Sequence, residues 1–416
     1  MIDDIRPPQK KKVKPSVPKS EIVNPELGHE DLSTDADSFL TPEQMAALDE
    51  AETKQPIGDE KPLKNKKNKK SKKFKLRMPK GKKEWAITLI VILLLTIGGF
   101  LIWQKFIKKQ PIALPGQSKK SNLVPSKLSG LPVKPSINDN PVIGVMIENS
   151  GDARPQSGLY DASVVFEAIA EGGITRFLAL YQDTQPENIG PIRSARPYYA
   201  QWVLGFDASY AHVGGSPAAL RDIKNWQVRD LDQFANGNSY KRVNSRPAPH
   251  NVYSSYQSLS ELADSKGYGT SSYTSLQRKS SSPAKTPNAK SISFTISGSL
   301  YNSIFEYDSK TNSYKREQAG TPHLDANGKQ INPKVVVALI IPYSIEPDRI
   351  HSAYDTLGTG QAYIFQDGKV SIGAWSKESN QDQFTFEDDS GNPIKLNAGK
   401  TWFTALANNT QVKYTP

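Results

Sequence analysis

The chain has 416 residues, a formal net charge of +11 and no cysteine. Because the chain has no thiols, it can form no disulfides, Cys-ligated zinc sites, iron–sulfur clusters or thiolate nucleophiles. Its length suffices for two or three domains. The positive charge does not indicate nucleic acid binding, because many lysines lie between Lys61 and Lys83, directly before an apolar run.

This apolar run, residues 85–103, is predicted to be a transmembrane helix. It carries no charge and begins and ends with Trp85 and Trp103, which suit the two membrane interfaces. About nineteen residues at ~1.5 Å each cross a hydrocarbon core of ~30 Å. Because the lysine-rich segment precedes the run, the positive-inside rule places the N-terminus in the cytoplasm and the remaining chain outside. A cleaved signal peptide is disfavoured by the long segment before the run.

The segments on either side of this run lack the composition of folded domains. Residues 1–84 are poor in aromatic residues and rich in Pro, Lys, Asp and Glu, which predicts a disordered cytoplasmic tail. A capped helix at 41–50 is the exception, and it could dock a partner. Residues 104–137 are rich in Pro, Ser and Lys and are predicted to be an extracytoplasmic linker.

Residues 138–285 are predicted to form a mixed α/β domain. Three runs rich in strand-forming residues are separated by glycine-containing turns, and three segments with helical spacing follow them. The expected strands are 141–147, 163–169 and 174–181, and the expected helices are 197–204, one beginning after Ser216, and 256–266. The polar stretch 268–290 is predicted to be a connection.

Residues 286–416 are predicted to form a mainly-β domain. Short alternating runs are joined by turn residues such as Asp367-Gly368 and Ser390-Gly391. The run 335–341 is apolar on both faces, which indicates a central strand. The expected fold class is therefore α+β, with an α/β domain followed by a mainly-β domain after a disordered tail and one transmembrane helix.

Several motifs resemble the DUF3048 family, in order and over about residues 142–406. The N-terminal motifs are IGVMIEN (143–149), ARPQSGL (153–159), EGGITR (171–176), GPIRSARP (190–197), HVGGS (212–216) and PHN (249–251), and the C-terminal ones are YKR (314–316), GTGQAY (358–363), GAWSK (373–377) and GKTW (399–402). The resemblance implies two domains and exposure outside the membrane, with no assigned activity. Typical members resemble lipoproteins anchored through cysteine, whereas this chain has none and would use the helix instead.

The motif at 190–197 is the first candidate for binding chemistry. Arg193 and Arg196 lie in a loop that leads into a helix beginning at Pro197. Backbone N–H groups, the positive helix end and two guanidinium groups together favour a carboxylate or phosphate ligand. The alternative is that these arginines form structural ion pairs with Glu167 and Glu171. The motifs add Arg154 and Arg176 as further ligand-binding candidates, and Glu167 and Glu171 are counted among the ligand-binding candidates as well.

Two histidine motifs supply the candidate catalytic residues. His212 follows a short strand and precedes two glycines and Ser216, which is both a helix cap and a candidate ligand contact. His250 is followed by Asn251, which could orient the ring or bind a substrate carbonyl. Either histidine could act as a general base, although a lone histidine is more often structural. No metal is expected, because the spacing of zinc-binding helices is missing.

Other common catalytic arrangements are not supported. Glu167 and Glu171 would stand ~13 Å apart on a straight strand, too far for a glycosidase pair, unless a bulge or the Gly172-Gly173 turn folds Glu171 back. A G-x-S-x-G serine motif and nucleotide-binding fingerprints are also missing, so no cofactor is expected.

These observations favour a membrane-anchored protein that binds an anionic cell-envelope ligand, such as a peptidoglycan or teichoic-acid fragment, in an Arg/His cleft. A non-catalytic adapter that recruits proteins at the membrane is one alternative, and a cell-wall hydrolase is another. Whether the protein is an enzyme stays open. The expected partners are the plasma membrane, a wall ligand and other proteins, but not nucleic acid.

Overall fold

The computed structural model describes residues 81, 93, 96–98 and 122–416. The predicted tail, most of the predicted transmembrane helix 85–103 and the first part of the linker lie outside these residues. Leu93 and Thr96–Gly98 are helical. In the portion that the structure describes, no helix is long and apolar enough to cross a membrane.

One ten-stranded mixed sheet runs through the body in the order β20-β19-β18-β15-β22-β4-β5-β3-β6-β7. Its strands are β3 (Ile143–Glu148), β4 (Val164–Glu171), β5 (Ile174–Tyr181), β6 (Ser209–Ala211), β7 (Arg229–Asp230), β15 (Val335–Ile340), β18 (Gly358–Gln366), β19 (Lys369–Lys377), β20 (Thr385–Glu387) and β22 (Thr401–Leu406). Strand β22 runs parallel to both β15 and β4. The two predicted domains therefore contribute to one sheet, and the run at 335–341 lies inside it as predicted.

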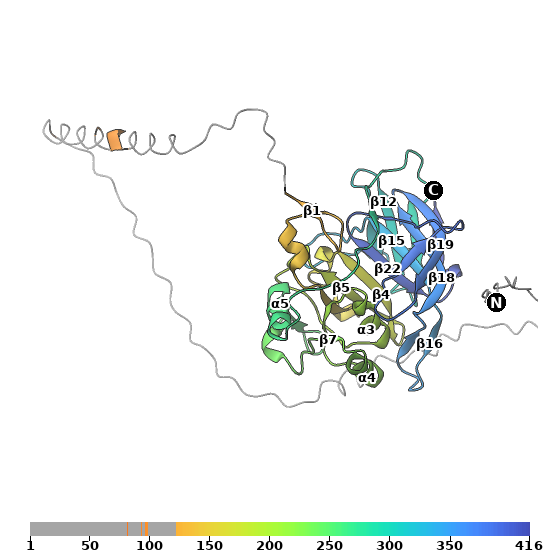
Figure 1. The fold of residues 1–416 in the computed structure, drawn as a ribbon, viewed down its shortest axis with the longest axis horizontal. Coiled ribbons are helices and arrows are strands. Elements are labelled where there is room, and N and C mark those ends of the chain that lie inside the picture. The colour runs from red at the N-terminus through yellow and green to blue at the C-terminus, as the bar shows by residue number, and fades with distance from the viewer. Residues whose placement is uncertain (1–80, 82–92, 94–95, 99–121) are drawn as a thin grey trace, which may run out of the picture. The chain divides into compact units, whose positions relative to one another are not determined.

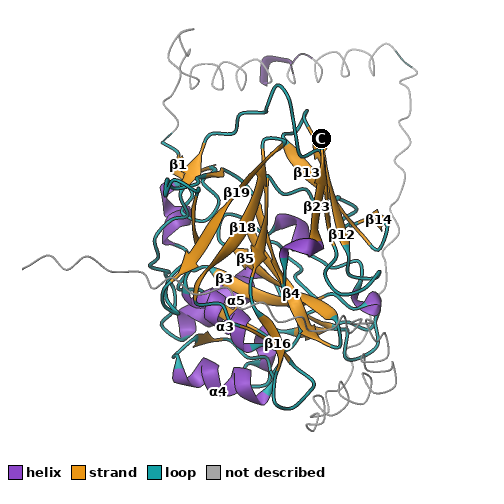
Figure 2. Cartoon of the chain, turned by 90° about the vertical axis from the view of Figure 1, so that its right-hand side faces the viewer, coloured by secondary structure: helices purple, strands orange, loops and turns teal. Residues whose placement is uncertain are grey.

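A second, antiparallel sheet has the order β14-β13-β12-β11-β23. Its strands are β11 (Ser291–Phe294), β12 (Ser303–Asp308), β13 (Ser313–Gln318), β14 (Thr321–Pro322) and β23 (Val412–Thr415). Figure 2 shows β12, β13 and β23 side by side, apart from the helices α3 and α4. Four strand pairs complete the β structure: β1 (Val124–Pro125) with β2 (Pro132–Val133), β8 (Lys241–Arg242) with β9 (Val252–Tyr253), β10 (Arg278–Lys279) with β21 (Leu396–Asn397), and β16 (Tyr343–Ile345) with β17 (Ser352–Tyr354).

Three α-helices of the described body begin as the sequence predicts (Figure 1). They are α3 (Pro197–Leu204), α4 (Pro217–Asn225) and α5 (Tyr256–Ser265). The hydroxyl of Ser216 caps α4 by accepting from the N–H of Ala219 at 3.2 Å. Ser255 caps α5 in the same way.

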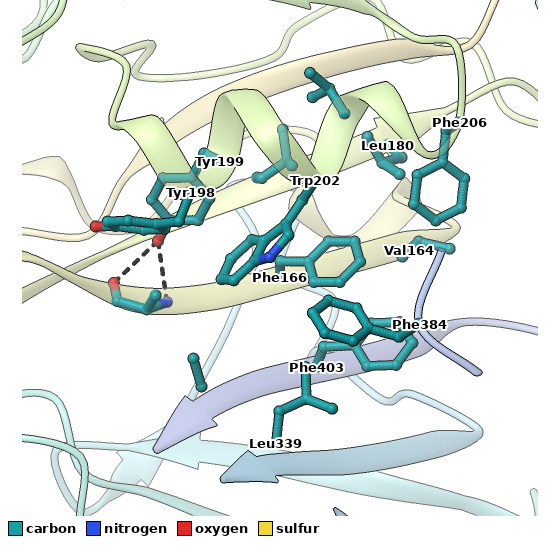
Figure 3. Close-up of a cluster of buried hydrophobic side chains, with 14 of the residues drawn as sticks. Val164, Phe166, Leu180, Tyr198, Tyr199, Trp202, Phe206, Leu339, Phe384 and Phe403 are labelled. Carbon is teal, nitrogen blue, oxygen red and sulfur yellow. Dashed lines mark hydrogen bonds between the residues drawn. The ribbon is translucent and has the colours of Figure 1, made fainter. Parts of the chain in front are cut away.

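One face of the large sheet packs against α3. Phe166 on β4 stacks between Trp202 of α3 and Phe403 of β22, with ring centroids 5.1 and 4.6 Å apart. The Tyr199 hydroxyl contacts the backbone N–H and C=O of Ala168 at 3.0 and 2.9 Å (Figure 3). Aromatic side chains from both halves of the chain thus share this core, which fixes α3 on the sheet.

The opposite face of the large sheet packs against the second sheet and α5. Buried side chains from β4, β5 and β22 meet Phe294 and Phe305 of the second sheet and Leu259 of α5. Because strand side chains alternate between faces, Phe166 points to α3 while its neighbour Glu167 points to this second core. A charged group therefore lies between two apolar layers and needs a partner there.

The described body is mostly β with few helices. The polar stretch 268–290 contains only the short strand β10 and is otherwise a connection, as predicted. Residues 122–137, assigned to the linker from the sequence, contain β1 and β2, and Leu128 is fully buried. Arg278 donates to the carbonyl oxygen of Leu128 at 2.7 Å, so this end of the linker packs on the body.

Candidate functional site

Three of the predicted ligand-binding arginines come together at the ends of β4 and β5. Arg193 and Arg196 lie on the segment between β5 and α3, and the N–H of Arg193 donates to the carbonyl oxygen of Met146 on β3 at 2.9 Å. Arg176 lies on β5, and its Nη1 donates to the carbonyl oxygen of Ser194 at 2.7 Å. The motif at 190–197 therefore contacts both β3 and the Arg176 side chain of β5.

Glu171 binds two of these arginines. Its carboxylate is contacted by Nη2 of Arg176 and by Nη2 and Nε of Arg196, the last at 3.0 Å. Burial alone would raise the pKa of Glu171, but the charges of Arg176, Arg196 and Arg193 lower it to about 2. The carboxylate therefore stays ionised and fixes both guanidinium groups in place.

The backbone at the end of β4 explains how Glu171 reaches these arginines. The pairing of β4 with β5 shifts register between Ile169 and Glu171, and Gly172 and Gly173 both have positive φ, +52° and +78°. This irregularity is the bulge and turn that would be needed to redirect Glu171. Glu167 and Glu171 nevertheless have different partners, so they do not form a catalytic carboxylate pair.

A second carboxylate, Glu148 at the end of β3, links Arg193 to His250. Arg193 Nε lies 3.6 Å from Glu148 Oε1, and His250 Nδ1 lies 2.8 Å from the same oxygen. The Ser150 hydroxyl donates to it at 2.7 Å. Burial would raise the pKa of Glu148, but Arg193 and His250 lower it overall. Glu148 therefore orients the His250 ring from beneath.

The outer edge of this group is formed by the exposed Arg242 of β8 and by the half-buried His250 and Asn251, which precede β9. Arg242 Nη1 donates to Oδ1 of Asn251 at 2.8 Å. Burial and the positive charge of Arg193 lower the pKa of Arg242, so the two guanidinium groups repel each other. Asp152, with 84% of its side chain exposed, lies 4.0 Å from His250 Nε2. We call Glu148, Arg193, Arg242, His250 and Asn251 the His250 edge.

The His250 edge does not have the geometry of a serine hydrolase triad. In such a triad the serine and the acid contact different nitrogens of the histidine ring. Here the Ser150 hydroxyl and the Glu148 carboxylate both face Nδ1, at 3.5 and 2.8 Å. The arrangement can hold and orient an imidazole beside several cations, which suits anion binding.

Glu167 belongs to a buried network, to which the half-buried Arg154 is linked through Asn149 and Thr175. Arg316 on β13 donates to both carboxylate oxygens of Glu167, at 3.0 and 2.9 Å, and Trp402 Nε1 donates to Oε2 at 3.1 Å. The side chains of Glu167 and Arg316 are both fully buried. Arg154 donates from Nε to Oδ1 of Asn149 at 3.1 Å, at the end of β3. This network ties the two halves together and is structural.

His212 and Ser216 also have structural roles here. His212 is fully buried, with Nδ1 2.7 Å from the carbonyl oxygen of Gly214 and Nε2 3.0 Å from Asp230 Oδ1. Both ring nitrogens thus contact oxygen atoms of the protein, which hold the ring in place. Ser216 uses its hydroxyl to cap α4. The structure does not bring these two residues to the His250 edge.

Some important residues were not among the predicted site residues. Glu148 and Arg316 stand inside the recognised motifs, and Glu148 directly follows a predicted strand, which is a signal that could have identified it. Arg242 gave no signal, because it lies in a polar loop without a motif. In the chain as described, no three His, Asp or Glu side chains gather as metal ligands.

The body of the chain is mostly β, and a cluster of buried charged side chains lies next to the His250 edge. It belongs to a family that is defined by two consecutive domains. The family models described as "Protein of unknown function (DUF3048)", N-terminal and C-terminal domain, match residues 128–269 and 292–403. The chain is a member of the DUF3048 family.

Two comparisons with individual proteins agree with this assignment. The chain is 30% identical over 303 residues to "Putative lipoprotein YerB" of Bacillus subtilis (strain 168), covering 72% of this chain and 90% of that protein. The crystal structure of the YerB protein from Bacillus subtilis superposes with a TM-score of 0.64 at 27% identity, covering 70% of this chain and all of that chain.

Proposed function

We propose that this protein is held at the outer face of a bacterial plasma membrane and binds an anionic cell-envelope ligand at the His250 edge. The helix predicted at 85–103 would be the anchor, with the N-terminus in the cytoplasm. The name of the similar protein, "Putative lipoprotein YerB", supports a membrane-attached position for this chain as well. The ligand would be a peptidoglycan or teichoic-acid fragment.

The observation that carries the ligand proposal is the crowding of positive charge at an exposed edge. Arg242 lies at the surface, and Arg193, whose charge acts on Arg242, has a side chain only 5% exposed. Burial, together with the positive charge of Arg193, lowers the pKa of Arg242, so a negative group beside Arg242 would be stabilised by both charges. His250 and Asn251 can add hydrogen bonds to the same group.

The buried part of the cluster keeps these cations in position. Arg176 and Arg196 are held by Glu171, and Arg193 lies against Glu148. Side chains that are already ordered lose little conformational entropy when a ligand binds. The edge therefore offers a preorganised set of donors rather than flexible surface lysines.

The binding proposal can be tested by cosedimentation of the full-length protein, in detergent, with purified cell-wall sacculi that carry or lack teichoic acid. Arg242→Gln removes the surface charge without leaving a buried carboxylate uncompensated, so it should weaken binding several-fold. Lys413→Gln on β23, an exposed lysine in the second sheet, is the matched control and should bind like wild type. Equal binding by Arg242→Gln and wild type would refute the proposal, and the two wall preparations distinguish the ligand source.

The position relative to the membrane can be tested separately. A protease added to intact cells whose wall has been removed should digest the body after residue 122 and leave the N-terminal tail protected. An epitope tag at each end reports on the two regions. A body that becomes accessible only after membrane lysis would contradict the proposed orientation.

A further inference from the structure

A cavity of about 670 Å³ shares no lining residue with the His250 edge. Its walls come from the C-terminal end of α3, the connector 272–277, and the segment that follows β19 and includes β20. The connector lies between the two family domains, so both halves of the chain contribute to the cavity. Its volume is within the range of small-molecule sites.

The floor of this cavity is apolar and partly aromatic. Phe384 and Phe386 are each 5% exposed, and Leu276 and Leu396 are 7% and 2% exposed. The ring of Tyr273 lines the cavity beside them. An apolar group would therefore meet the half-buried ring of Tyr273 and the remaining exposed parts of these apolar side chains.

Hydrogen bonds across the two halves form the cavity before any ligand binds. Gln383 Nε2 donates to the carbonyl oxygens of Gly205 and Thr274, at 2.9 and 2.8 Å. The Lys377 ammonium donates to three carbonyl oxygens of the loop 379–382 and is only 2% exposed. These contacts fix the wall, and they occupy Lys377, the one basic side chain among the described residues that line the cavity.

The charged groups left at the mouth are acidic. Glu378 and Glu387 line the cavity and are exposed, whereas the carboxylate of Asp382 accepts hydrogen bonds from Ser379 and that of Asp207 is bound by Arg229 at 2.7 Å. A positive group at the mouth would meet the carboxylates of Glu378 and Glu387, and its apolar part would reach the aromatic floor. Aromatic faces also attract cations directly.

We propose that this cavity binds an organic cation that carries an apolar group, that is, an aryl- or alkylammonium or guanidinium group. The positive end lies beside Glu378 and Glu387, and the apolar end packs on Phe384, Phe386 and Tyr273. The group could belong to a free amine or to a Lys or Arg side chain of a peptide. This site is independent of the proposed anion site.

The test is isothermal titration calorimetry of the full-length protein in detergent with phenylethylammonium, with its uncharged analogue phenylethanol, and with the dipeptide acetyl-Phe-Lys-amide. The ammonium probe should bind, and phenylethanol should bind more weakly. The Glu378→Gln, Glu387→Gln double variant should lose about tenfold in affinity for the cation, since each exposed carboxylate contributes modestly. Binding of the dipeptide in addition to the amine would identify a peptide source, and binding of the amine alone a free ligand.

Two further variants make the result specific to the cavity. Ser275→Trp places a large side chain at an exposed lining position and should abolish binding, while Glu306→Gln on β12, also exposed, should not change it. Equal unfolding temperatures would show that these variants are folded. The proposal is overturned if neither cation binds, if phenylethanol binds as tightly as the ammonium, or if Ser275→Trp and the double variant bind like wild type.

Discussion

At the scale of single residues, the molecule is notable for how many charges it buries, each with a specific partner. Glu171 holds Arg176 and Arg196, Glu148 lies against Arg193, and Glu167 holds Arg316. Buried ion pairs add little net stability compared with apolar residues, but removal of one member leaves an uncompensated charge. These ion pairs therefore favour one arrangement of the strands and loops that carry them over alternative arrangements.

The ionisation of Glu171 should make stability depend on pH. Its folded-state pKa of about 2 lies below the ordinary value of 4.5, so its contribution is complete above pH 4.5 and is lost as pH falls towards 2. Glu171→Gln should cost about 3 to 5 kcal/mol near pH 7, because two buried arginines lose their counter-charge. Urea unfolding should show this difference shrinking by about 3 kcal/mol between pH 5 and pH 2. A difference that stays constant over this range would contradict the assignment.

The Glu167–Arg316 pair should show strong coupling. Arg316→Met leaves the fully buried Glu167 without its counter-charge and should cost about 3 to 5 kcal/mol in the free energy of unfolding. Adding Glu167→Gln should recover part of that loss, because the buried charge is then gone while Trp402 keeps a hydrogen-bond acceptor. Chemical denaturation of the two single variants and the double variant measures the coupling. Strictly additive losses would show that the pair does not interact as described.

At the scale of elements, the sequence located most helices and strands but not their partners. Helices α3, α4 and α5 begin where proline and serine caps predict, and β4 and β5 follow their alternating or apolar runs. The local periodicity of apolar residues predicts which side chains are buried, but it does not predict which other elements they pack against. Glu167 and Arg316 are 149 residues apart, and no local pattern could have paired them.

The packing of α3 against the loop after β19 depends on a glycine. A Cβ at Gly205 would lie 2.7 Å from the carbonyl oxygen of Asp382, so Gly205→Ala must displace this loop. We expect a loss of about 1 to 3 kcal/mol, from overpacking. Gly298→Ala is the matched control, because nothing lies within 4 Å of its added Cβ. Thermal unfolding compares the two, and equal melting temperatures would contradict the close contact.

At the scale of the whole molecule, β22 is the strand that joins the halves. It lies between β15 and β4 in the ten-stranded sheet, so a strand of the C-terminal half pairs with β4, which would otherwise be an edge strand of the N-terminal half. Composition and turn signals predicted two consecutive domains, because such signals describe only residues that are close together in the sequence. They carry no information on a parallel pairing between strands more than 200 residues apart. The predicted domain boundary between residues 285 and 286 stays a prediction.

The shared sheet predicts that the two halves fold together. Expressed separately, residues 122–285 and 286–416 should each lack stable tertiary structure, because β4 and β22 would expose unpaired edges and Glu167 would lose Arg316. Amide hydrogen exchange should show little protection in either fragment, and mixing the fragments should restore it. Strong protection of the isolated N-terminal fragment would show instead that it is an independent domain.

The central claim is that an anionic envelope ligand binds between Arg242 and Arg193 at the His250 edge. Calorimetric titration of the full-length protein with a purified teichoic-acid fragment, repeated over a range of salt concentrations, tests it most directly. We predict binding that weakens as salt rises, because the charges at the edge are screened, and that weakens further in Arg242→Gln. Binding that is insensitive both to salt and to Arg242 would contradict the claim, as would no binding at low salt.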